Sequence, residues 1–133
     1  RLLNKQSGLL GLTGHSDLRD IEAKAENGDR ECQLALEMNA YRVKKYIGAY
    51  TAAMNGLDAV VFTAGIGENS SLLRELICAD MDYLGISLDG TRNQEVSGSP
   101  WEINTPNSRL KVLVIATNEE LEIAQQVFGL LDP

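Results

Sequence analysis

The N-terminal half of the chain has the hydrophobic spacing of helices. From residue 29 to residue 55, apolar positions recur mostly every three or four residues without a proline, which predicts one long helix. A shorter helix is predicted over residues 18–27, with Ser16 as its N-cap and Gly28 as its terminator. Residues 1–16 carry three glycines and no sustained period, so this segment is predicted to be a packed loop.

The C-terminal half alternates short β-branched runs with segments of helical spacing. The predicted elements are, in order, strand 58–63, helix 71–81, strand 86–88, an irregular or hairpin-like excursion over 89–108, strand 110–116 and helix 119–129. Strands that alternate with helices favour an α/β architecture with a largely parallel central sheet. We therefore expect residues 1–133 to form one α/β domain.

Charge and composition narrow the class of partner. The formal net charge is −7 and the pI is near 4.6, which argues against nucleic acid and anionic membranes as partners. No apolar run approaches the roughly 20 residues that cross a bilayer, and no signal peptide is recognisable, so we expect a soluble, cytoplasmic protein. Cys32, Cys78 and the single histidine, His15, are too few to ligate zinc. Because the first residue is Arg1, we expect the chain to be part of a longer protein.

Two turns lead from a predicted strand into a helix, and each could bind a ligand. The first, residues 64–69, contains Gly65 and Gly67, which permit positive φ and let a ligand approach the backbone. It matches neither G-x-G-x-x-G nor the Walker A sequence, so a nucleotide-binding turn and a purely structural turn both stay open. The second turn places Glu119 and Glu120 at a helix start, where they could hold magnesium beside a phosphate or serve only the helix dipole.

The segment around residues 15–19 offers a third candidate. The guanidinium of Arg19 could stack on a base or pair with a phosphate, but a surface salt bridge with Glu22 or Glu26 fits the spacing equally well. His15 has no partner motif, so neither a Ser-His-Asp nor a Cys-His constellation can be assembled. Hydrolase chemistry of those types is therefore not expected.

Three segments in this order and spacing closely resemble the C-terminal part of the acetokinase family, which includes acetate, propionate and butyrate kinases: LNKQSGLLGLTGHSDLRDIE, FTAGIGENS and VIATNEELEIA. The resemblance implies a ribonuclease H-like domain of the actin-like ATPase fold, the C-terminal half of an acetate/sugar kinase–Hsc70–actin fold that binds nucleotide between two domains. It assigns magnesium to Glu119, and it assigns nucleotide contacts to Asp17, Leu18, Arg19, Gly65, Ile66, Gly67, Glu68 and Asn69. Relatives often have Phe where Leu18 stands.

The same resemblance implies reversible transfer of the γ-phosphoryl group of ATP to acetate, giving acetyl phosphate and ADP. It implies that the catalytic residues lie upstream of Arg1, so the 133 residues alone should be inactive, and that the full enzyme is a homodimer. It also implies that helix 119–133 packs on the first domain, which would leave this helix uncovered here and favour self-association. Two alternatives are a non-catalytic dimerisation or scaffold module of the same fold, and a flavodoxin-like domain with a flat, contiguous parallel sheet. The kinase hypothesis requires Arg19, Gly65, Gly67 and Glu119 to converge on one groove.

Overall fold

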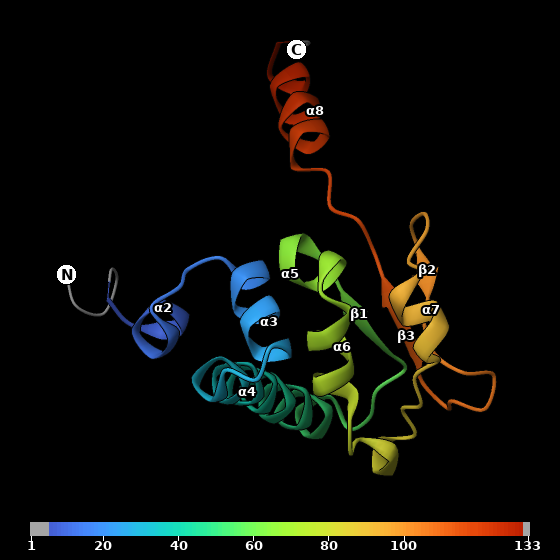
Figure 1. Ribbon diagram of the computed structural model, residues 1–133. Coiled ribbons are helices and arrows are strands. Elements are labelled where there is room, and N and C mark those ends of the chain that lie inside the picture. The colour runs from blue at the N-terminus through green and yellow to red at the C-terminus, as the bar shows by residue number, and fades with distance from the viewer. Residues whose placement is uncertain (1–5, 132–133) are drawn as a thin grey trace.

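The computed structural model describes residues 6–131, and at its centre is a small mixed sheet of order β1-β3-β2 (Figure 1). Strand β1 (Ala59–Phe62) pairs in parallel with β3 (Lys111–Val114). Strand β2 (Trp101–Glu102) pairs antiparallel with β3. The predicted strands at 58–63 and 110–116 are confirmed as β1 and β3, although only alternate residues of each are buried. The sheet is mixed because the excursion before β3 returns as an edge strand.

Helices cover one side of this sheet and extend away from it (Figure 1). Helix α6 packs against the long helix α4, which also contacts α2 and α3. The helices are α2 (Gly8–Thr13), α3 (Leu18–Glu26), α4 (Arg30–Met54), α5 (Ala64–Asn69), α6 (Ser71–Cys78), the 3-10 helix η1 (Asp82–Leu84), α7 (Gly90–Gln94) and α8 (Glu119–Leu131). None of the described helices is long and apolar enough to cross a membrane.

Side-chain caps fix where the helices begin. Asp17 accepts a hydrogen bond from the amide of Arg19, so the N-cap of α3 is Asp17 and the prediction of Ser16 is wrong by one residue. Gly28 follows the C-cap with a φ of 92°, as predicted for a helix terminator. Helix α4 is capped by Asp29 and α6 by Ser70. Each cap satisfies amides that the helix itself leaves unpaired.

Three local predictions are corrected by the structure. The predicted loop over 1–16 contains helix α2, bounded by left-handed glycines at Gly8 and Gly14; residues 1–5 of that prediction lie outside the described residues. The predicted strand 86–88 is reduced to one isolated bridge, between Leu88 and Asn104. The excursion over 89–108 contains α7 and the edge strand β2. Short elements of this kind depend on tertiary contacts more than on their own periodicity.

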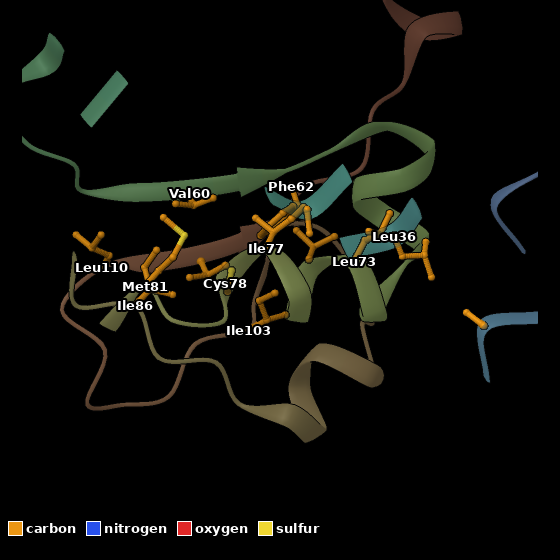
Figure 2. Close-up of a cluster of buried hydrophobic side chains, with 14 of the residues drawn as sticks. Leu36, Val60, Phe62, Leu73, Ile77, Cys78, Met81, Ile86, Ile103 and Leu110 are labelled. Carbon is orange, nitrogen blue, oxygen red and sulfur yellow. The ribbon is translucent and has the colours of Figure 1, made fainter. Parts of the chain in front are cut away.

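The hydrophobic core lies between the sheet and helices α4 and α6, as Figure 2 shows. Val60 and Phe62 project from β1 toward Ile77 and Cys78 of α6. Burial raises the pKa of the Cys78 thiol to about 12, and burial also raises the pKa of Cys32. Both thiols therefore stay protonated in the folded chain, which excludes them as nucleophiles near neutral pH.

Helix α8 stands apart from the rest of the fold. It follows β3 and extends away from the sheet and the helices around it (Figure 1), and none of its described residues is buried. Its large apolar side chains are all at least half exposed: Leu121, Ile123, Val127, Phe128, Leu130 and Leu131. The sequence-based expectation that this helix lacks apolar cover within the 133 residues is confirmed for residues 119–131; residues 132–133 lie outside the described residues.

Candidate functional site

The start of α3 and the short helix α5 form the two walls of one pocket. Its volume is about 440 Å³, within the range of about 300–1,000 Å³ typical of small-molecule sites. It is lined by Asp17, Leu18, Arg19, Glu22, Gly65, Ile66, Asn69 and Ser70. Six of the eight residues predicted to contact nucleotide thus line one pocket, although they come from two segments far apart in the sequence.

An ion pair holds the Arg19 side chain at this pocket. Its Nη2 lies 2.6 Å from Oδ2 of Asp17, and its Nε lies 3.0 Å from Oδ1. These bonds from Arg19 lower the pKa of Asp17 to about 2, so the carboxylate stays ionised at any pH near neutrality. The Arg19 side chain is 89% exposed, which leaves its guanidinium accessible to a ligand while the ion pair restricts its rotamers.

The glycine-containing turn is a short helix, and its two glycines differ in role. Neither has a positive φ; the left-handed residue is Ala64, with a φ of 59°. A Cβ at Gly65 would meet no atom within 4 Å, whereas a Cβ at Gly67 would lie 3.2 Å from the carbonyl carbon of Phe62. The backbone at Gly65 is therefore open to a ligand, whereas Gly67 packs on the end of β1.

Glu68 faces the second predicted turn and does not line the pocket. Its Oε1 accepts hydrogen bonds from the amide of Thr117 at 2.9 Å and from the Thr117 hydroxyl at 3.0 Å. These bonds hold the pKa of Glu68 below its usual value. Glu68 thus joins α5 to the segment that leads into α8. A flavodoxin-like domain is excluded, because that hypothesis required a parallel sheet and no contact between these two turns.

Glu119 begins α8 and does not line the pocket. The side chain of Asn118 caps the helix by accepting from the amide of Leu121, and the first turn carries three carboxylates, from Glu119, Glu120 and Glu122. Across residues 6–131, no group of three or more His, Cys, Asp or Glu side chains is arranged to hold a metal ion. One exposed carboxylate fits magnesium that arrives with phosphate and water as its other ligands. Of the four residues that the kinase hypothesis requires on one groove, Arg19 and Gly65 line this pocket, whereas Gly67 and Glu119 do not.

A buried arginine behind the pocket was not predicted from the sequence. Arg74, in α6, is only 2% exposed. Its Nη1 donates to the backbone carbonyls of Gly67 at 2.8 Å and Glu68 at 2.9 Å. Its Nε donates to Oδ1 of Asn93 at 2.7 Å and its Nη2 to the Asn93 carbonyl at 2.6 Å. The available signal was its place beside Leu73 and three residues before Ile77, on the apolar face of the helix.

A larger groove of about 660 Å³ lies between α3, α4 and α6. It shares Arg19 and Glu22 with the smaller pocket, but it contains no glycine and is lined by three carboxylates, those of Glu22, Glu26 and Glu37. The larger groove has one more carboxylate than the smaller pocket, so it disfavours an anionic ligand more strongly. We therefore place the candidate site in the smaller pocket, where the backbone of α5 is accessible.

Comparison with known proteins identifies the family of the chain. Residues 1–125 match the model of the acetokinase family. The chain is 66% identical over 131 residues to an acetate kinase of Flavobacterium johnsoniae, covering 98% of this chain and 33% of that protein. It is 53% identical over 130 residues to an acetate kinase of Carboxydothermus hydrogenoformans, covering 98% of this chain and 32% of that protein.

Solved structures show the same relationship. The crystal structure of Porphyromonas gingivalis acetate kinase superposes with a TM-score of 0.88 at 45% identity, covering 98% of this chain and 33% of that one. A propionate kinase of Francisella tularensis gives a TM-score of 0.85 at 46% identity, with coverages of 93% and 31%. The chain spans about a third of the length of the curated relatives it matches. With its actin-like ATPase fold, the chain belongs to the acetokinase family.

Proposed function

We propose that this chain is the nucleotide-binding part of an acetate kinase, an enzyme that reversibly transfers the γ-phosphoryl group of ATP to acetate and forms acetyl phosphate and ADP. The observation that carries the proposal is the pocket in which the start of α3 meets α5. Both segments belong to motifs by which the sequence resembles this family. A scaffold module without a ligand would not need Gly65 to remain open to solvent.

The lining favours the nucleoside end of the ligand. Ile66, half exposed, and Leu18 offer apolar surface to a purine ring. The carboxylates of Asp17 and Glu22 can accept hydrogen bonds from ribose hydroxyls or a base amino group. Among residues 6–131, Arg19 is the only cation in the lining, and Asp17 already neutralises it. The phosphates therefore extend out of the pocket, where magnesium held by Glu119 and water would offset their charge.

We expect the 133 residues by themselves to bind nucleotide without transferring phosphate. Phosphoryl transfer depends on in-line positioning and on cations around the transferring group. Within the described residues, the pocket supplies one arginine that is already paired, so the charge on a transferring phosphoryl group would not be neutralised. The acyl pocket and the remaining cations belong, in this proposal, to other parts of a full-length enzyme.

Calorimetric titration of the chain with Mg-ADP tests the nucleotide assignment. We expect saturable binding at one site with a Kd on the order of 0.1–1 mM, weak because the pocket contacts the nucleoside and leaves the phosphates outside it. Adenosine should compete, and inorganic pyrophosphate should not, because the pocket binds the nucleoside. Competition by pyrophosphate but not by adenosine would show that the pocket binds the phosphates and not the nucleoside. The absence of any saturable heat would contradict nucleotide binding by this chain.

We further propose that the chain self-associates through the apolar side of α8. Phe128 and Leu130 are 68% and 84% exposed, and uncovered apolar surface of this kind favours association. In sedimentation velocity, the weight-average coefficient should rise over a roughly 100-fold range of protein concentration. Phe128→Glu should reduce this rise, whereas Glu120→Gln, a control at the exposed start of the same helix, should not. A monomer at every concentration would refute the proposal.

A further inference from the structure

The buried guanidinium of Arg74 has no carboxylate partner among the described residues. All four of its hydrogen bonds go to uncharged oxygens, three backbone carbonyls and the side-chain oxygen of Asn93. Removing a cation from water is costly, and leucine or methionine would fill the same volume without that cost. Burial lowers the pKa of Arg74, in keeping with this desolvation. The position of the charge therefore needs an explanation beyond packing.

The explanation lies in the element that Arg74 contacts. Helix α5 has six residues, too few to be stable alone, and its last carbonyls have no partners within the helix. Nη1 of Arg74 binds two of these carbonyls, those of Gly67 and Glu68. A cation also interacts favourably with the C-terminal end of a helix. Arg74 thus completes the end of α5, while the other end of the same short helix carries Gly65 and Ile66 into the pocket.

Asn93 extends this support to α7. It is 2% exposed, and its Nδ2 donates to the carbonyl of Ser71 at 2.9 Å. The side chains of Arg74 and Asn93 therefore make five hydrogen bonds in all, and these bonds join α5, α6 and α7. Because both side chains are buried, water competes little for their donors, which strengthens these hydrogen bonds.

We propose that Arg74 is a positioning residue of the nucleotide site: it fixes α5 in the conformation that forms the pocket wall, and Asn93 connects this wall to α7. The inference rests on the proposed function only in naming nucleotide as the ligand. Arg74 does not line the pocket, so its effect on binding is indirect. A preformed wall spares a ligand the cost of ordering it, and this is how a buried side chain can raise affinity without contact.

Hydrogen exchange measured by mass spectrometry separates positioning from general stability. In Arg74→Gln, without nucleotide, amides of residues 64–70 should exchange about tenfold faster than in the original chain, while the protected core of α4 should be unchanged. The matched control is Arg92→Gln. Arg92 is next to Asn93 in the sequence, but its side chain is half exposed, and its ion pair with Asp89 is weak, with Nε 4.0 Å from Oδ2. This control should leave both regions unchanged. Faster exchange in α4 as well as α5 would show a merely structural role and overturn the proposal, as would unchanged exchange in α5.

The conservative variant and the ligand complete the test. Lysine keeps the charge but cannot donate to α5 and to Asn93 at the same time. Arg74→Lys should therefore also speed amide exchange in residues 64–70, but by less than Arg74→Gln. If Arg74→Gln does not fold, the exchange of Arg74→Lys decides by the same criteria. Where the original chain binds Mg-ADP, the Kd should rise about tenfold in Arg74→Gln and recover partly in Arg74→Lys. If the original chain does not bind, the proposed function fails, and the exchange data still judge the positioning of α5.

Discussion

Replacing Gly65 by valine is expected to weaken Mg-ADP binding by about 100-fold, or about 2.7 kcal/mol, while the chain remains folded. Gly65 lines the pocket, has no positive φ, and has no atom within 4 Å of the position that a Cβ would take. The new side chain would therefore meet the ligand and not the protein. Its effect on the free energy of unfolding should stay within about 0.5 kcal/mol, as for other exposed substitutions.

Gly67→Val is the matched control for this prediction. The two glycines are in the same short helix, but a Cβ at Gly67 would press on the backbone of Phe62 at 3.2 Å. This variant should lose about 1–3 kcal/mol of stability through overpacking. Calorimetry with Mg-ADP and thermal unfolding followed by circular dichroism measure both effects. Equal heats for Gly65→Val and the original chain would show that nucleotide does not bind against α5.

Replacing Ile21 by alanine should reduce the free energy of unfolding by about 2–5 kcal/mol. Ile21 is fully buried in the core and lies on α3, the helix whose start carries Asp17 and Arg19. Truncating this side chain removes buried apolar surface and leaves a cavity in the core beside α3. Unfolding in urea, followed by circular dichroism, measures the loss.

The same substitution at an exposed position provides the comparison. Ile123, in α8, is 62% exposed, so Ile123→Ala should change the free energy of unfolding by no more than about 0.5 kcal/mol. If Ile123→Ala destabilised the chain as much as Ile21→Ala at a concentration where the chain is monomeric, α8 would be packed against its own fold, contrary to the structure. If Ile21→Ala were neutral, α3 would not be anchored in the core, and the pocket would lack its first wall.

Long elements with one buried face could be predicted from the sequence. Helix α4 was predicted to within one residue at each end, because its apolar spacing and its limits at Asp29 and Asn55 agree. Strands β1 and β3 were predicted because their β-branched runs match burial in the core. Helices α2 and α5 were missed because glycine suppresses the helical signal, and α5 is held by a side chain that lies elsewhere in the sequence.

The site could be predicted only in part. The pattern alone left both glycines of the turn open to a ligand, and only the tertiary structure shows that Gly67 packs on Phe62. Glu68, predicted as a nucleotide contact, is bound to Thr117. Arg74 was missed because a charged residue on a helix is usually exposed, and one position on the apolar face does not reveal which carbonyls it meets.

The most direct measurement is to follow the backbone amide signals of the isotope-labelled chain by nuclear magnetic resonance as Mg-ADP is added. We expect the largest shifts to cluster at four of the residues that line the pocket: Arg19, Gly65, Ile66 and Asn69. Smaller shifts at Thr117 would follow its hydrogen bond to Glu68. Shifts centred on Gln33 and Glu37 in the larger groove, or no shifts at millimolar nucleotide, would contradict nucleotide binding in the smaller pocket.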